Sequence, residues 1–209
     1  MVYFNIHKST TAQGKRFDVL YICNMSVDIL HTGQLLCSKP YIGDPFFERS
    51  VVLVTQHSPQ GTEGLILNQR IDLENPEDMG IIGDFTSEFR IGGPVANDRC
   101  YFLHCRPDLL PNSQFIANDI YFGGDLKVLE HLLNTRTMGD DDIRFYIGIS
   151  GWEANQLQRE LDENTWFVED AKSFEWITNG GTEMWKSIVN EKGHPYTLYA
   201  QGPENPEHN

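Results

Sequence analysis

The feature that most limits the possible folds is a run of four aliphatic residues, Val51 to Val54, within the stretch SVVLVTQH. An unbroken run of this kind is typical of a strand that is buried on both faces, because a half-exposed strand would alternate apolar with polar side chains. A second apolar run, Gly64 to Asn68 (GLILN), follows the turn SPQGTEG. We therefore expect a sheet that is covered on both sides, as in layered α/β proteins.

Further strands are predicted in the middle of the chain. Two short strands flank the turn Gly92-Gly93-Pro94, and the second of them covers Tyr101 to Cys105. Another strand pair is expected within SQFIANDIYFGG, and YTLYA, residues 196–200, is expected to close the sheet. The turn itself indicates a tight backbone corner, and a close approach to a ligand is the alternative.

Helices are predicted mainly in the second half. In residues 125–136, Leu126, Leu129 and Leu133 fall at i, i+3 and i+7 on one face, and Asp125 stands where an N-cap is wanted. A last helix is expected over residues 182–191, burying Trp185 and two aliphatic residues of the same face. Strands and helices therefore alternate in this half, as α/β folds require.

The stretch FYIGISGWEANQLQRELDENTW, residues 145–166, indicates an apolar strand, a tight glycine turn and an amphipathic helix. Ser150 and Glu153 have the S-x-x-E spacing of a capping box at the start of that helix. The expected apolar stripe consists of Ala154, Leu157 and Leu161, while Glu160 is expected to face water.

Together these elements predict an α/β fold, with a layered α/β/α main domain around a mixed sheet and a smaller α+β lobe. Residues 1–24 are expected to be a flexible N-terminal extension and residues 201–209 a flexible tail. Residues 25–200 are expected to form a single domain, with the small lobe within residues 75–125.

The composition of the chain limits the classes of partner that it can bind. The chain of 209 residues carries 16 Lys plus Arg against 30 Asp plus Glu, a formal net charge of -14, which disfavours direct binding to nucleic acid. No stretch approaches the roughly 18 apolar residues of a membrane-spanning helix. The four cysteines form no C-x-x-C pair, so free thiols in the cytoplasm are expected, while the role of Cys37 and the oligomeric state stay open.

Three residues are weak catalytic candidates. Ser150 could be a nucleophile, but the G-x-S-x-G pattern fails at Trp152, and a capping role already accounts for a serine at this position. His57 and His104 could act as a base. The Gly151 turn could hold an anion or oxyanion at a helix N-terminus. No metal site is predicted, because His104 and Cys105 point to opposite faces of a strand and the acidic run at 140–142 suits a solvated turn.

Several of these stretches, in this order, resemble the signature segments of the bacterial YqgE/AlgH family. They are GQLLCSKPYIGDPFFERSVVLVTQH, GTEGLILN, IGGPV, FLH and GISGWEANQLQREL, and the resemblance covers roughly Gly33 to Ile188. It implies a compact α/β fold with a three-layer part and a smaller part. The family has no established activity and no assigned catalytic residue, and "transcriptional regulator" is its frequent label. It usually carries alanine where Ser150 stands, and a glycine and a carboxylate that are missing from residues 153–158 here.

We therefore expect a cytoplasmic, non-enzymatic binding or regulatory protein without a cofactor, which acts through a protein partner or a small-molecule ligand. Polar groups at the ends of strands and helices are where a scaffold holds its binding residues. The groove candidates are Asn68, Gly92, Gly93, Pro94, Gly151, Trp152 and Gln156. The alternative is a hydrolase or transferase that uses His57 or His104 with the Gly151 turn.

Overall fold

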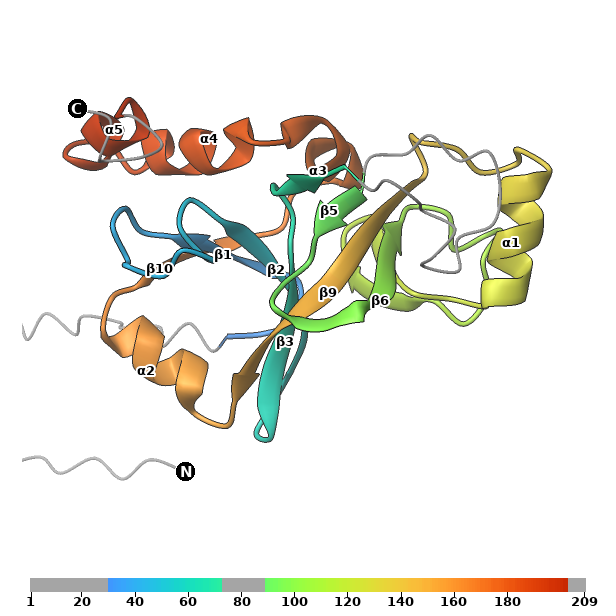
Figure 1. Cartoon of the computed structure of the whole chain (residues 1–209), viewed down its shortest axis with the longest axis horizontal. Coiled ribbons are helices and arrows are strands. Elements are labelled where there is room, and N and C mark those ends of the chain that lie inside the picture. Colours follow the sequence, from blue (N-terminus) through green and yellow to red (C-terminus); the bar gives the residue numbers. More distant parts are fainter. Residues whose placement is uncertain (1–29, 73–88, 203–209) are drawn as a thin grey trace, which may run out of the picture.

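The structure, a computed structural model of the chain, describes residues 30–72 and 89–202. The predicted extension at 1–24 and nearly all of the predicted tail at 201–209 lie outside these residues. The described part combines helices with a strongly curled sheet (Figure 1).

The described strands join into a mixed sheet of ten strands, in the order β10-β1-β2-β3-β9-β6-β8-β7, with β5 paired to β9 and β4 paired to β5. Only the β5–β9 pair among them is parallel. The strands are β1 (Gln34–Ser38), β2 (Val51–Ser58), β3 (Gly61–Ile66), β4 (Arg70–Ile71), β5 (Phe89–Ile91), β6 (Val95–His104), β7 (Gln114–Ala117), β8 (Ile120–Phe122), β9 (Ile143–Glu153) and β10 (Trp166–Asp170). The predicted mixed sheet is confirmed.

The helices lie on different sides of this sheet. They are α1 (Leu126–Asn134), α2 (Gln156–Asp162), α3 (Phe174–Gly180), α4 (Glu183–Glu191) and α5 (Tyr196–Ala200). In Figure 1, α3 and α4 run along one side of β1 and β2, α2 lies on the opposite side, and α1 stands at the far end. The predicted helices at 125–136 and 182–191 are confirmed, and the Asp125 carboxylate accepts bonds from the backbone N–H groups of Lys127 and Val128.

The strand predicted at 196–200 is wrong, because these residues form α5. The ring of Tyr196 packs edge-on against Phe167 of β10, with 4.9 Å between the ring centroids. Tyr199 meets Tyr41 in the same way at 5.4 Å. These aromatic contacts pack α5 against β10 and against the loop between β1 and β2 instead of extending the sheet, so tertiary packing overrides the β propensity of the segment.

Strands β1, β2 and β3 send alternate side chains into two hydrophobic cores. The core under α3 and α4 contains Leu35, Leu53, Leu65, Phe174 and Trp185. The core under α2 contains Leu36, Val52, Ile66, Trp152 and Leu157. The expectation that Val51 to Val54 is buried on both faces is therefore confirmed.

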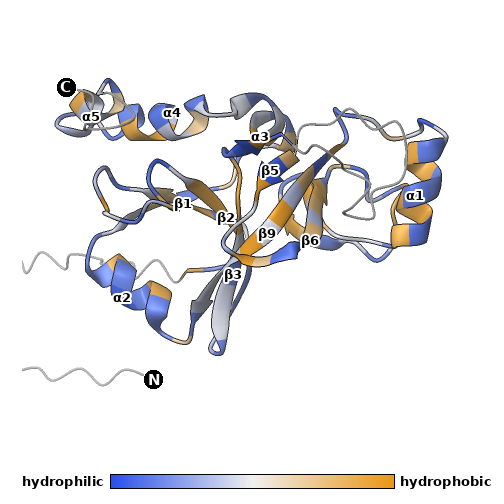
Figure 2. Cartoon of the chain, viewed as in Figure 1, coloured by the Kyte–Doolittle hydropathy of each residue, from blue (hydrophilic) through white to orange (hydrophobic). Residues whose placement is uncertain are grey.

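The other half of the sheet is organised differently. A third core beside α1 takes alternate residues of β9, namely Ile143, Phe145 and Ile147. Figure 2 shows β9 as a predominantly hydrophobic ribbon, in keeping with its burial from Ile143 to Ser150, whereas β6 is polar and mostly exposed in its first half and buried only over its last three residues. Helices thus cover both faces only around β1 to β3, so a layered α/β/α arrangement of the whole domain is not confirmed. Whether residues 75–125 form a lobe of their own stays a prediction.

The sheet curls until its end strand β7 lies against the start of β1. The Gln114 side-chain amide donates to the carbonyl oxygen of Thr55 at 3.1 Å, and the Asn118 amide donates to that of Ala171. A Cβ atom on Gly33 would lie 2.8 Å from the carbonyl oxygen of Ile116, so only glycine fits where the two ends meet. Side-chain amides therefore close the curl where no strand pairing does so.

The glycine turn predicted at 148–151 is also wrong, because β9 continues to Glu153. The chain between β5 and β6 crosses over β9 at this point, as the green segment in Figure 1 shows. A Cβ atom on Gly93 would lie 2.2 Å from the carbonyl carbon of Ile149, and one on Gly92 would lie 2.3 Å from the carbonyl oxygen of Gly148. The glycines therefore allow two backbones to touch, and they form no strand-to-helix corner.

Helix α2 consequently begins later than predicted, at Gln156, and the capping box of Ser150 and Glu153 does not form. Asn155 takes a left-handed conformation with φ 63°, and the Gln156 side-chain oxygen accepts from the backbone N–H of Glu153. Asparagine tolerates this conformation better than most residues, so it can turn the chain from β9 into the helix. Ala154, expected in the apolar stripe, is exposed.

Candidate functional site

The larger of two pockets that contain predicted site residues lies between the first turn of α4 and the ends of β2, β3 and β5. We call it the α4 pocket, and its volume is about 480 Å³. Pockets that hold small molecules commonly measure about 300–1,000 Å³. Its lining residues are Glu48, Arg49, Asn68, Gln69, Arg70, Ile91, Thr182, Trp185 and Lys186.

Arg49 is held in this pocket by contacts to its backbone and to its side chain. The Asn68 side chain donates to the carbonyl oxygen of Arg49 at 2.8 Å and accepts from the backbone N–H of Val51 at 2.9 Å. Arg49 has a positive φ of 54°, which costs energy in any residue other than glycine. Its guanidinium lies 5.1 Å from the ring of Trp185 and donates to the carbonyl oxygen of Gly202. Asn68 thus fixes the backbone that presents Arg49.

Two further basic side chains line the same pocket. Arg70 extends from β4 toward the junction of α3 and α4, where a Cβ atom on Gly181 would lie 3.3 Å from its Nη2. Lys186 comes from α4 and pairs with Glu183 at 2.9 Å. The lining thus contains three basic residues and one acidic residue, Glu48, in a chain whose formal net charge is -14. The pocket is therefore locally basic on an acidic protein.

Trp152 and Gln156, two of the predicted groove residues, belong instead to a network around Glu160. The indole N–H groups of Trp152 and Trp166 both donate to Oε2 of Glu160 at 2.9 Å. The Gln156 amide donates to Oε1 of the same carboxylate at 3.0 Å. Both tryptophans are buried, so Glu160, expected to face water, anchors α2 to the sheet.

The predicted glycine and proline candidates are divided between the interior and the surface. Gly92 and Gly93 are buried where the chain crosses β9, and Pro94 and Gly151 are exposed. None of these four, nor Trp152 or Gln156, lines the α4 pocket, which takes only Asn68 from the predicted set.

Ser150 and His104 are engaged in structural hydrogen bonds. Ser150 is fully buried, and its hydroxyl donates to the carbonyl oxygen of Gly92 at 3.0 Å. His104 accepts the backbone N–H of Arg106 at Nδ1, so its proton is on Nε2, which faces the Ser113 hydroxyl and the carbonyl oxygen of Gly123. Burial lowers the pKa of His104. A neutral imidazole with both nitrogens occupied has no free site for a general base.

His57 has a different setting, at the tip of the β2–β3 hairpin. Its Nδ1 lies 2.8 Å from the hydroxyl of Thr62, the residue paired with it across the strands. Both line a second pocket of about 310 Å³, which we call the hairpin pocket, together with Glu153. Of the catalytic candidates, His57 alone lines one of these two pockets.

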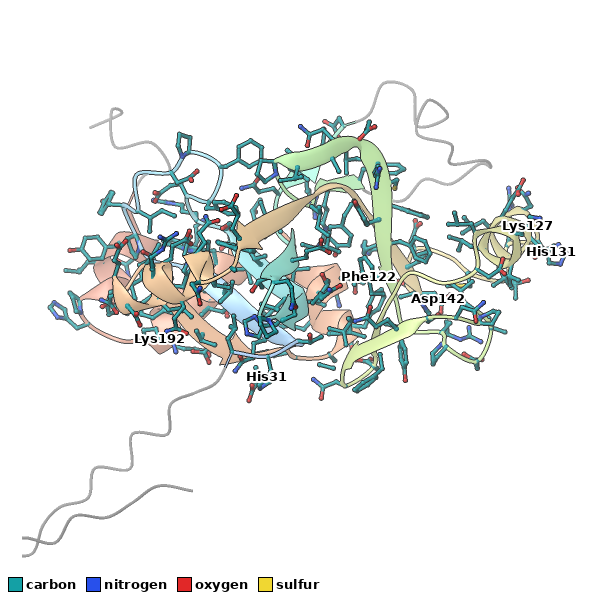
Figure 3. The ribbon with its side chains drawn as sticks, turned by 90° about the horizontal axis from the view of Figure 1, so that it is seen from below. His31, Phe122, Lys127, His131, Asp142 and Lys192 are labelled. Atoms are coloured by element: carbon teal, nitrogen blue, oxygen red, sulfur yellow. The ribbon has the colours of Figure 1, made fainter. Side chains whose placement is uncertain are left out.

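No group of three His, Cys, Asp or Glu side chains within residues 30–72 and 89–202 could hold a metal ion. The acidic run at 140–142 forms a turn before β9, as expected, and Asp142 accepts from the backbone N–H of Gly139 and pairs with Arg106. Figure 3 shows Lys127 and His131 on the outer side of α1.

Cys37 is buried, and burial raises its pKa to about 12. In the described part of the chain, no helix is long and apolar enough for a membrane span.

No sequence pattern indicated the residues that make the α4 pocket basic. Arg49 lies within the family-like segment PFFERS, but Arg70 and Lys186 stand in stretches without a recognisable motif. The three come together only because α4 folds back over the ends of β2 and β3, and no local pattern reports such a contact.

Comparison with known proteins agrees with this architecture. A sequence profile of the AlgH-like family matches residues 35–197. A UPF0301 protein of Chlorobium luteolum is 35% identical over 177 residues, which are 85% of this chain and 94% of that protein. A UPF0301 protein of Cytophaga hutchinsonii is 35% identical over 183 residues, which are 87% of this chain and 100% of that protein.

Two solved structures share the fold. The X-ray structure of a Corynebacterium diphtheriae protein matches with a TM-score of 0.65 and 20% identity, over 84% of this chain and 94% of that one. The solution structure of the AlgH protein of Pseudomonas aeruginosa matches with a TM-score of 0.62 and 23% identity, over 82% of this chain and 93% of that one. The matching profile and the similarity along most of both chains show that this chain belongs to the AlgH-like family.

Proposed function

We propose that the protein is a cytoplasmic, non-enzymatic binding protein whose small-molecule ligand or partner segment occupies the α4 pocket. The observation that carries this proposal is the construction of the pocket around Arg49. The Asn68 hydrogen bond and the left-handed conformation fix the backbone of Arg49, and the Trp185 ring 5.1 Å from its guanidinium holds the side chain at the pocket before anything binds. A side chain fixed in advance loses less conformational entropy on binding, which favours affinity.

The engagement of two catalytic candidates in structural bonds supports the same proposal. Ser150 and His104 use their polar atoms in bonds to backbone carbonyl groups or in a closed network. Any regulatory effect on transcription would run through the bound ligand or partner. With a formal net charge of -14, long-range electrostatics oppose direct contact with DNA.

A blocking substitution tests this proposal. Thr182 is exposed at the rim of the pocket and makes no side-chain capping bond to α4, so Thr182→Trp fills the entrance with little cost in stability. Thr137→Trp makes the same change on an exposed threonine beyond α1 and serves as the control. Native mass spectra should show an adduct on the wild type and on the control that Thr182→Trp lacks. An adduct retained equally by all three proteins would place binding elsewhere.

A second candidate function is hydrolysis or group transfer in the hairpin pocket, with His57 as the base and Thr62 as its hydroxyl partner. The 2.8 Å contact between them, beside Glu153, favours it. The predicted helix N-terminus at Gly151 does not contribute, because Gly151 lies within β9. Hydrolysis of activated esters or phosphate esters that is lost in His57→Gln would support this candidate. Rates equal to buffer alone would exclude it for those substrates.

A further inference from the structure

We infer that the α4 pocket binds a small molecule with at least two negatively charged oxyanion groups, either phosphates or carboxylates. This inference rests on the proposed binding function and names the chemical class of the ligand. It depends on two features of the lining: an excess of basic side chains, which the whole chain does not have, and the supply of these side chains by three separate parts of the fold.

Three cationic side chains reach the pocket from three separate parts of the fold. Arg49 precedes β2, Arg70 begins β4, and Lys186 lies in α4. One carboxylate, that of Glu48, is part of the same lining, and a second, that of Glu183, pairs with Lys186 at 2.9 Å, so three cations face two carboxylates. The whole chain has the opposite balance, with 16 basic against 30 acidic residues, so the excess of cations in the pocket is a local property. A locally positive pocket on a negative surface favours anions at that place and repels them elsewhere.

The chemistry of the donors favours oxyanions in particular. Arginine presents planar N–H groups that match the paired oxygens of a phosphate or a carboxylate, whereas a halide ion uses only one of them. The ring of Trp185 lies 5.1 Å from the Arg49 guanidinium on one side, and the Gly202 carbonyl oxygen accepts a hydrogen bond from it. The pocket also offers neutral hydrogen-bonding groups in the Gln69 amide and the Thr182 hydroxyl.

The size of the pocket separates a polyvalent small molecule from a single inorganic ion. A volume of about 480 Å³ exceeds what one phosphate fills, and the cations enter from different elements. A ligand that carries two or more anionic groups can therefore meet more than one cation at once. Ile91 supplies an apolar contact for the part of the ligand between those groups.

Calorimetric titration with pyrophosphate and with citrate, at constant ionic strength, tests the inference. The wild type should bind at least one of them, and Arg70→Gln and Lys186→Gln should each weaken that binding about tenfold. Lys172→Gln removes the same charge from an exposed lysine that is absent from the pocket lining and should leave the affinity unchanged. Binding of pyrophosphate alone indicates a phosphate ligand, and binding of citrate alone indicates a carboxylate ligand.

The inference is overturned if neither anion binds the wild type, or if Lys172→Gln weakens binding as much as Lys186→Gln does. These failures differ from a failure of the proposed binding function. An uncharged or cationic adduct that is present on the wild type and absent from Thr182→Trp would leave the binding function standing and exclude the anionic class. An adduct that is still present on the Thr182→Trp protein would exclude the α4 pocket as the binding site.

Discussion

Replacing Glu160 tests whether the motif around α2 is structural. Its carboxylate receives three hydrogen bonds, two from the buried indoles of Trp152 and Trp166 and one from Gln156. In Glu160→Ala all three donors lose their partner at once. Phe47 stacks on Trp152 with 5.7 Å between ring centroids, so the same cluster also ties the segment before β2 to α2.

The structure allows the cost to be estimated. A hydrogen bond to a charged acceptor contributes about 1.5–3 kcal/mol, and a buried donor without a partner costs about 1–3 kcal/mol. Glu160 is only half-buried, so water can replace part of its role. We expect Glu160→Ala to lower the free energy of unfolding by about 3 kcal/mol, which is about 6–12 °C in Tm for a chain of this length.

Glu160→Gln is the informative partner. A glutamine carbonyl oxygen in the place of Oε2 can still accept both indole N–H groups, while the bond from Gln156 is lost. We expect a loss of about 1 kcal/mol. Urea unfolding followed by circular dichroism measures both variants, with Glu163→Ala, an exposed residue just past α2, as the control. A Glu160→Ala protein as stable as that control would refute the anchoring role.

Three further outcomes follow from the geometry. Gly93→Ala should prevent folding or greatly lower the stability of the fold. Gly151→Ala should leave the stability unchanged, because its Cβ atom would meet only a Val95 methyl group at 4.0 Å. Thermal unfolding of both variants compares them. Burial lowers the pKa of His104 below its ordinary 6.5, so the free energy of unfolding should fall as the pH drops below about 6.5. Urea unfolding from about pH 7 to pH 5 measures this decrease, and His104→Gln should make it smaller. Cys37, whose pKa is about 12, should resist a thiol reagent until the protein unfolds, as mass spectrometry of the labelled peptides would show.

Elements that depend on local signals were predictable from the sequence. The N-cap at Asp125 identified α1, although Leu126 of the predicted stripe is exposed and Leu132 is buried with Leu129 instead. The aliphatic run at Val51 to Val54 identified a strand buried on both faces. In both cases the pattern that determines the structure lies within about a dozen neighbouring residues.

The remaining features depend on contacts between distant parts of the chain. The glycines near Ser150 resembled a turn because their actual partner, the crossing segment at Gly92, is 58 residues away in the sequence. Glu160 resembled a solvent-exposed helix residue because its partners Trp152 and Trp166 lie on other elements. Five ordered motifs predicted the family, but those residues hold the fold together more than they line the pocket.

The central claim is that the α4 pocket, and not the hairpin pocket, receives the ligand. Amide hydrogen exchange of the wild type, with and without a deproteinised bacterial extract, tests this claim most directly. We predict slower exchange in residues 48–50, 68–70 and 182–186, no change in residues 57–62, and no protection of the pocket segments in Thr182→Trp. Protection confined to residues 57–62, or equal protection in Thr182→Trp, would contradict the claim.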